Sequence, residues 1–163
     1  MRDASPKGAS HLPILIEMVQ KTAGPILELG IGPYSTPVLH ALAEFRDRKL
    51  ISYENNEGYY NRFRRFKTKE HEINLIDDWS TIDIDKRRWS VAFIDHAPAE
   101  RRKHEIRRLA YNTDFVVVHD TEPLHEDEYN YSEIYKFFKY RKTYKKLNPY
   151  TTVFSNVYGS PNS

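Results

Sequence analysis

Acidic side chains, some of them beside a histidine, stand near the ends of the apolar runs that could form strands in this chain. One run carries Glu28, and the later runs end at Glu54, Asp78, Asp95 and Asp120. Ligands of an open α/β sheet bind outside the carboxyl ends of its strands, so these groups would meet along one edge. Carboxylates there accept hydrogen bonds from hydroxyl and amino groups. This spacing predicts a ligand site rather than a set of solvated turns.

A tight turn after the first of these runs supplies a second part of the site. Residues 26–29 form a short apolar run, Gly30 and Gly32 follow it, and a helix-like pattern occupies residues 38–45. Glycines let backbone amides approach a ligand because they carry no Cβ. Ser35 stands where the dinucleotide fingerprint requires a third glycine. Alone, the turn is compatible with any nucleotide-like ligand or with a plain strand-to-helix connection.

The apolar pattern predicts strands that alternate with helices. Parallel strands are expected at residues 26–29, 49–54, 73–76, 89–95 and 114–120, and an antiparallel terminal pair at 142–147 and 151–157. Helices are expected at residues 12–22, 38–45, 57–66, 99–110 and 131–140. Such alternation predicts a Rossmann-like, doubly wound α/β sheet of seven strands in three layers. We expect one domain over residues 1–163, with flexible ends at 1–10 and 158–163.

Composition narrows the class of protein. The 163 residues suffice for one sizeable core, and the absence of cysteine excludes disulfides, thiolate metal sites and a cysteine nucleophile. No apolar run approaches the length of a membrane span, which predicts a cytoplasmic protein without a membrane partner. The net charge of +2 gives no strong attraction to nucleic acid. The basic, aromatic segment 62–67 is therefore interpreted as a solvated helix face, with RNA contact as the alternative.

This order of elements resembles the class I S-adenosylmethionine-dependent methyltransferases. The segment Glu-Leu-Gly-Ile-Gly at residues 28–32 looks like their first motif, and the terminal antiparallel pair is similar to their fold. The resemblance spans roughly residues 14–157 and implies a small, little-decorated member of that superfamily. It also implies S-adenosylmethionine as the cofactor. The positions that it assigns to the cofactor are Glu28, Gly30, Gly32, Ser35 and Glu54.

Each of these side chains, and two more, has an expected contact. Ser35 would hydrogen-bond the amino acid end of the cofactor, and Glu54 would accept both ribose hydroxyls. Asp78 would accept the adenine amino group while the indole of Trp79 covers the ring. The alternatives are that Glu54 belongs to a helix cap and that Trp79 is a core residue.

The second half of the chain carries the groups expected to act on the methyl acceptor. The chain is similar to O-methyltransferases of the catechol type, in which an acid after the fourth strand and an acid–amide pair after the fifth hold Mg²⁺. Asp95 and Asp120 match the two acids, whereas Thr121 stands where the amide would be. Two carboxylates and waters still satisfy the preference of Mg²⁺ for oxygen. Without a metal, His96 or His119 would be the general base.

The resemblance therefore implies methyl transfer from S-adenosylmethionine, with Asp95, His96 and Asp120 orienting or deprotonating the acceptor. The favoured acceptor is a hydroxyl on a small molecule or sugar. Methylation of RNA or protein, cleavage of the cofactor without transfer, and a binding module without activity are the alternatives. Amino methylation of DNA bases is disfavoured, because the Asn/Asp-Pro-Pro-aromatic motif is missing after the fourth strand. A sparsely covered sheet edge is compatible with a homodimer.

Overall fold

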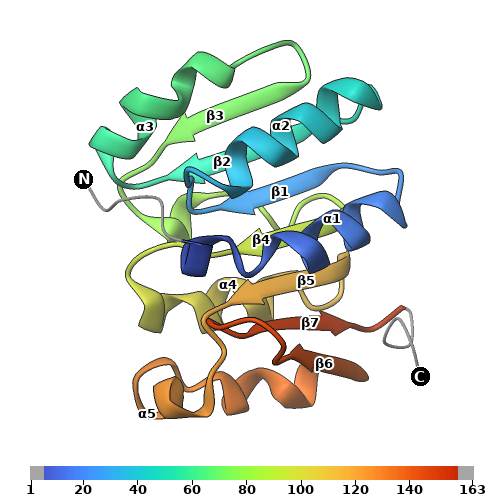
Figure 1. Cartoon of the computed structure of the whole chain (residues 1–163), viewed down its shortest axis with the longest axis vertical. Coiled ribbons are helices and arrows are strands. Elements are labelled where there is room, and N and C mark those ends of the chain that lie inside the picture. The colour runs from blue at the N-terminus through green and yellow to red at the C-terminus, as the bar shows by residue number, and fades with distance from the viewer. Residues whose placement is uncertain (1–5, 158–163) are drawn as a thin grey trace.

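The structure is a computed structural model, and it describes residues 6–157. Figure 1 shows one twisted sheet with helices packed on both of its faces. The strands are β1 Ile26–Leu29, β2 Leu50–Glu54, β3 His71–Leu75, β4 Trp89–Ile94, β5 Thr113–His119, β6 Tyr140–Tyr144 and β7 Thr151–Ser155. The helices are α1 Leu12–Gln20, α2 Ser35–Phe45, α3 Glu57–Phe63, α4 Arg102–Leu109 and α5 Glu126–Tyr129. Within residues 6–157, no helix combines the length and the apolar character needed to cross a membrane.

The sheet confirms the predicted architecture. Its seven strands follow the order β3-β2-β1-β4-β5-β7-β6, in which β1 to β5 are parallel. β7 lies between β5 and β6 and is antiparallel to both. The strands β6 and β7 form the predicted terminal pair. The chain winds outward from β1 to β3 and then returns to place β4 on the other side of β1. This reversal of strand order is where open α/β sheets bind ligands.

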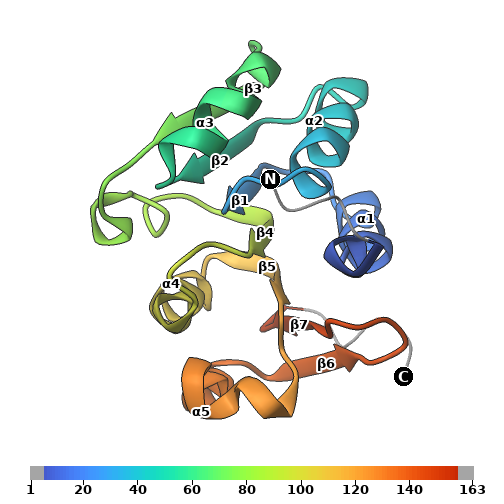
Figure 2. The ribbon, with the colours of Figure 1, turned by 60° about the vertical axis from the view of Figure 1, so that its left-hand side comes forward.

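Helices cover both faces of the sheet (Figure 2), and an apolar layer on each face holds them to it. Leu15, Met18 and Val19 of α1 and Leu39 of α2 pack on one face, and Ile106 and Leu109 of α4 pack on the other. Every residue of β4 is buried, because both faces of this central strand are covered. That burial explains why the central strands are continuous apolar runs instead of alternating ones.

The segment after β5 differs from the prediction. Instead of one α-helix over residues 131–140, the chain forms α5, then a 3₁₀ helix (η6) at Tyr131–Phe137, and enters β6 at Tyr140. Asn130 ends α5 in the left-handed conformation, with φ of 52°. Tyr131 and Ile134, three residues apart, are both buried. A 3₁₀ helix aligns such positions on one side, and the aromatic residues of this segment have modest α-helix propensity.

The start of the described chain, where a flexible segment up to residue 10 was predicted, contains regular structure and buried side chains. Pro6–Ala9 form a 3₁₀ turn (η1), and both Ser10 and His11 are buried. Ser10 Oγ donates a hydrogen bond to the carbonyl of Pro149 at 2.7 Å, which ties this segment to the loop before β7. The rest of the predicted flexible ends, residues 1–5 and 158–163, lies outside the described residues.

Candidate functional site

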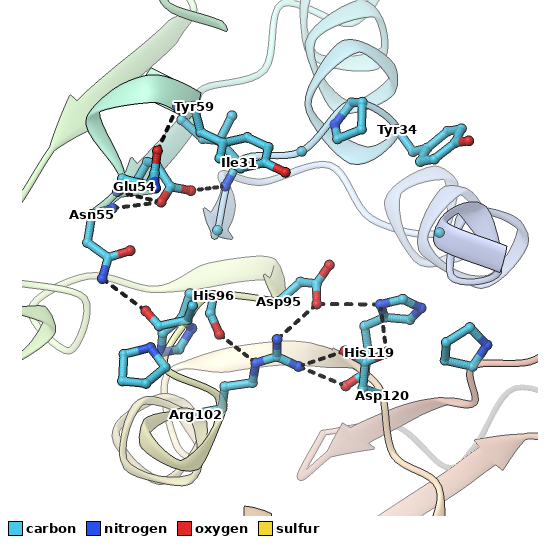
Figure 3. Close-up of a pocket in the computed structure, with 18 residues that line it drawn as sticks. Ile31, Tyr34, Glu54, Asn55, Tyr59, Asp95, His96, Arg102, His119 and Asp120 are labelled. Carbon is cyan, nitrogen blue, oxygen red and sulfur yellow. Dashed lines mark hydrogen bonds and ion pairs between the residues drawn. The ribbon is translucent and has the colours of Figure 1, made fainter. Parts of the chain in front are cut away.

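A cavity of about 790 Å³ opens at the carboxyl edge of β1, β2, β4 and β5 (Figure 3). The turn after β1 and the end of β2 form one wall, and the ends of β4 and β5 form the other. The sequence-predicted residues that line it are Gly30, Gly32, Glu54, Asp95, His96 and Asp120. Glu28, Ser35, Asp78 and Trp79 do not line it. Six of the residues that the strand-end argument selected therefore line one cavity, and the other four lie outside it.

The two glycines of the turn differ in what they do. Gly30 has φ of +94°, and a Cβ there would lie 2.6 Å from the backbone nitrogen of His96. A Cβ at Gly32 would meet only Ser35 Oγ, at an ordinary 3.6 Å. Gly30 is thus required because the loop after β4 approaches it closely. This requirement comes from packing within the protein and not from a ligand.

The amides of the turn are engaged within the protein, contrary to the expectation that they face a ligand. The Gly30 amide donates to the carbonyl of Tyr53 at 3.0 Å. The Ile31 amide donates to Glu54 Oε2 at 2.8 Å, and the Gly32 amide to Thr36 Oγ1 at 3.0 Å. These three hydrogen bonds therefore make the turn rigid. A ligand would contact the surface of the turn in the space around Gly32.

Glu54 joins the end of β2 to the turn after β1. Its carboxylate accepts hydrogen bonds from the amides of Ile31, Asn55 and Asn56, at 2.8, 2.9 and 2.7 Å. Burial raises the pKa of Glu54, and these three donors oppose that rise. A carboxylate has about four acceptor sites, so roughly one remains for a ligand. Capping of α3 falls to Asn56, whose Oδ1 accepts from the Tyr59 amide at 3.0 Å.

Glu28 lies beneath the turn and away from the cavity. It is the third residue of β1, fully buried on the face that α2 covers. Ser35 Oγ and Thr36 Oγ1 donate to its Oε1 at 2.7 and 2.9 Å, and Ser52 Oγ contacts its Oε2 at 2.5 Å. Burial raises the pKa of Glu28 to about 7, although these hydroxyls lower it in part. Glu28 and Ser35 therefore anchor α2 to the sheet, and the predicted cofactor contact of Ser35 is replaced by this bond.

Replacing Glu28 with glutamine should flatten the pH dependence of stability. The folded pKa of about 7 exceeds the ordinary value of 4.5, so the folded state retains a proton that the unfolded chain releases between these values. This stabilisation is complete below pH 4.5 and is lost as pH rises through 7, by about 3 kcal/mol. Urea unfolding at pH 5 to 8 should show that loss in the wild type and little of it in Glu28→Gln. The exposed Glu57→Gln is the control, and equal slopes in all three proteins would refute the assignment.

Asp78 and Trp79 support the wall of the cavity from behind. Asp78 caps a 3₁₀ turn (η3, Trp79–Thr81) by accepting from the Ser80 amide at 2.8 Å. The Trp79 indole is buried, and its Nε1 donates to the carbonyl of Ala97 at 2.9 Å. The ring centroid of Trp79 lies 4.2 Å from that of His96. The predicted adenine contacts of both residues are therefore absent from the described cavity, and Trp79 is a core residue.

His96 lines the wall of the cavity, but its imidazole is not accessible from the cavity. Its side chain is wholly buried, and Nε2 lies 3.2 Å from Glu105 Oε2 of α4. Burial lowers the pKa of His96 despite the nearby Glu105 carboxylate. A ring held between Trp79 and Glu105 cannot reach an acceptor in the cavity. This burial argues against the predicted catalytic role of His96.

Arg102 is the main residue that sequence reasoning missed. Its buried guanidinium lies between the two acids, with Nη2 3.1 Å from Asp95 Oδ1 and Nη1 3.3 Å from Asp120 Oδ2. Its Nε also donates to the carbonyl of His96 at 2.7 Å. Burial alone would lower the pKa of Arg102, but the two carboxylates and Tyr131 raise it. The only sequence signal was an arginine at the start of the helix that follows the fourth strand.

The expected Mg²⁺ does not fit between Asp95 and Asp120. The Arg102 guanidinium already bridges these carboxylates and supplies the positive charge. Thr121, at the position of the expected amide ligand, accepts a hydrogen bond on Oγ1 from Thr152 at 2.8 Å. The positive charge between the two carboxylates thus comes from a side chain of the same protein, and no reaction step is assigned to Mg²⁺.

His119 completes the charged cluster. Its Nδ1 lies 3.4 Å from Asp95 Oδ1 and 3.5 Å from Asp120 Oδ1, and its Nε2 lies 2.9 Å from Ser10 Oγ. Burial lowers the pKa of His119, but the two acids, chiefly Asp95, raise it above its ordinary value. Arg102 and His119 together lower the pKa of Asp95, although its burial acts in the opposite direction. The cavity therefore ends in a carboxylate that lies between an arginine and a histidine.

Similarity to known proteins is visible in the structure. No protein-family model and no curated protein sequence matches the chain. The O-methyltransferase TomG of Streptomyces achromogenes, involved in tomaymycin synthesis and solved with S-adenosylmethionine, has a similar structure. It is 16% identical with a TM-score of 0.67, and the match covers 95% of this chain and 83% of TomG.

Two further similar structures belong to other methyltransferases. An RNA methyltransferase from Salinibacter ruber, solved with S-adenosyl-L-homocysteine, is 13% identical with a TM-score of 0.57 over 93% of this chain and 95% of that one. A methyltransferase from Pyrococcus furiosus is 13% identical with a TM-score of 0.61, and the match covers 88% of this chain and 81% of that one. The chain has the fold of the class I S-adenosylmethionine-dependent methyltransferases.

Proposed function

We propose that this protein is an S-adenosylmethionine-dependent methyltransferase that acts on a hydroxyl of a small molecule or sugar. The observation that carries this proposal is the cavity at the carboxyl edge of the sheet. It joins the turn after β1, which is typical of a cofactor site, to the cluster of Asp95, Arg102, His119 and Asp120. A cofactor and an acceptor would thus share one opening.

The cofactor would lie along the wall that β1 and β2 form. Gly32 leaves room for a ligand against the turn, and Glu54 retains an acceptor site for one ribose hydroxyl. Tyr59 lines the cavity with an exposed ring, which suits an adenine better than the buried Trp79 does. Asn55 and Asn56 add polar groups beside it.

The acceptor would lie against the wall that β4 and β5 form. The Asp95 and Asp120 side chains are 29% and 26% exposed, so both acids are reachable from the cavity. Asp95 would hydrogen-bond the acceptor hydroxyl and orient its oxygen for in-line attack on the sulfonium methyl. The C–O bond would form as the C–S bond breaks, the hydroxyl proton would pass to the Asp95 carboxylate, and S-adenosylhomocysteine would leave. Arg102 and His119 would keep that carboxylate ionised and in place.

Binding of S-adenosylhomocysteine tests the first half of this proposal. Glu54→Ala should weaken binding by roughly 100-fold or more, because it removes a ribose acceptor and releases three amides that shape the turn. Isothermal titration calorimetry of the two proteins measures this change. Glu57→Ala, an exposed acid three residues along, is the matched control and should bind as the wild type does. Absence of binding by the wild type at millimolar ligand would refute the function.

Methylation of RNA is the second candidate, because a basic surface lies beside Tyr59 on α3 and the 3₁₀ turn that follows it (η2, Arg64–Phe66). Arg62 lies 5.4 Å from the ring centroid of Phe63, and Arg65 lies 5.2 Å from that of Phe66. These rings are already covered by cations of the same chain, which makes them poor platforms for bases. Salt-sensitive RNA binding that is lost in Arg64→Glu/Arg65→Glu would favour this candidate over the first.

A further inference from the structure

Three potential metal ligands converge beside the cavity, and two of them, Asp95 and His119, line it. One ligand atom from each of His11, Asp95 and His119 can be chosen so that all three lie within 4.8 Å of one another. They come from the residue before α1, the residue after β4 and the last residue of β5. The ring centroids of His11 and His119 are 4.7 Å apart. The fold thus assembles two imidazoles and a carboxylate from segments that are distant in sequence.

His11 is buried without the partners that a buried imidazole requires. It is 2% exposed, and neither of its ring nitrogens has a hydrogen-bond partner among the described residues. Its ring packs on Phe93, with centroids 4.6 Å apart. An imidazole buried against an apolar ring favours its neutral form, in which one ring nitrogen carries a lone pair. Buried polar groups are normally satisfied, so this imidazole indicates an additional binding partner.

The hydrogen bonds of His119 orient its other nitrogen toward the same point. Ser10 has one hydroxyl proton and donates it to the carbonyl of Pro149 at 2.7 Å. Ser10 Oγ must therefore accept from His119 Nε2, which lies 2.9 Å away. His119 Nδ1 is left facing Asp95 without a geometrically sound hydrogen bond. A ring fixed by an N–H bond on one side, with the other nitrogen directed at a ligand cluster, is typical of metal-binding histidines.

We propose that His11, Asp95 and His119 bind one transition-metal ion of the Zn²⁺ type at the end of the cavity. Two nitrogens and one carboxylate favour such an ion over Mg²⁺, which prefers oxygen ligands. Figure 3 shows one Asp95 oxygen in contact with both Arg102 and His119. A carboxylate oxygen has two acceptor positions, so this oxygen can serve Arg102 and an ion together.

The geometry needs a modest contraction on binding. Ligand atoms about 2.1 Å from a tetrahedral Zn²⁺ lie roughly 3.4 Å from one another. His119 Nδ1 and Asp95 Oδ1 are already 3.4 Å apart, so the movement falls mainly on His11. Asp95 and His119 line the cavity, which leaves a further coordination position on that side. This site shares Asp95 and His119 with the cluster around Arg102 and adds His11, and it goes beyond the proposed methyl transfer.

Metal titration of the apo protein tests this proposal. Tag-free protein stripped with EDTA and dialysed should bind one Zn²⁺ per chain by calorimetry and elemental analysis. Co²⁺ should give visible ligand-field absorption typical of four or five ligands. His11→Ala and His119→Ala should abolish that absorption, and Ser10→Ala should weaken binding roughly 10- to 100-fold while it leaves the three ligands in place. His104→Ala, on the exposed side of α4, should change nothing.

Two results would overturn the proposal. One is a wild-type protein that binds neither ion at 100 μM, an order-of-magnitude threshold well above the affinities of protein zinc sites. The other is a folded His11→Ala or His11→Gln protein, judged by circular dichroism, that retains the wild-type Co²⁺ spectrum. Metal should also raise the melting temperature of the wild type but not that of His11→Gln. Binding of S-adenosylhomocysteine is measured separately, so a failed metal site is distinguishable from a failed cofactor site.

Discussion

Substitution of Gly30 by alanine should destabilise the protein by about 2–5 kcal/mol and abolish binding of S-adenosylhomocysteine. The new Cβ would lie 2.6 Å from the His96 nitrogen and 2.7 Å from both the Asp95 carbonyl carbon and His96 Cα. These are backbone atoms, so no side chain can rotate away to relieve the contact. The positive φ of Gly30 adds strain for any residue that carries a Cβ. Urea unfolding and calorimetry measure the two effects.

Gly32→Ala is the matched control within the same turn. A Cβ at Gly32 has ordinary contacts, and stability should change by less than about 1 kcal/mol. Its effect on cofactor binding is informative in its own right, because the added methyl group would occupy space at the cavity wall. If Gly30→Ala proved as stable as Gly32→Ala, the close approach between the turn after β1 and the loop after β4 would be wrong.

Substitution of Arg102 by methionine should destabilise the protein by about 3–5 kcal/mol, because it leaves charged groups without their buried partner. Asp95 and Asp120 would both lose their ion pair, and the carbonyls of His96 and His119 would lose a donor. Methionine retains much of the apolar volume, so the loss is mainly electrostatic. The acceptor wall should also lose its geometry, which predicts lower methyl transfer in any assay that detects it.

Two controls separate this effect from a general loss of positive charge. Arg88→Met removes an exposed arginine that pairs with Asp114, and its cost should be at most about 1 kcal/mol. Combining Arg102→Met with Asp95→Asn and Asp120→Asn should recover part of the lost stability, since neutral amides no longer need the cation. Equal costs for Arg88→Met and Arg102→Met would contradict the buried ion-pair arrangement.

Most strands could be predicted from local sequence because their signal is local. Residues 26–29, 89–94 and 113–119 are largely apolar segments that a strand covered on both faces explains well. The prediction of an α-helix at 131–140 was wrong because contacts with residues distant in sequence decide the structure of this segment. Ile134 belongs to a core cluster with Phe154 of β7, and such contacts favour the three-residue repeat over the α-helical one.

The candidate site was predicted as an edge of the sheet but not as a set of contacts. Glu54, Asp95 and Asp120 could be placed there, because strand ends follow from strand positions. Glu28 was misplaced because a residue within a strand points to one face or the other, and only helix packing decides what that face meets. Arg102 was missed because a helical arginine carries no local signal of the acids that it will bridge.

The turn after β1 illustrates what sequence alone determined about this protein. The sequence specified glycines at residues 30 and 32 and an acid at the end of the second strand. It also specified an alternation of elements that yields a methyltransferase-like sheet. Tertiary structure alone decided that the amides of the turn bind Glu54 and Thr36, and that Arg102 takes the position expected for a metal. It also brought His11 beside His119, across 108 residues. Composition and spacing act through neighbours in the chain, whereas charge pairing and ligand geometry act through neighbours in space.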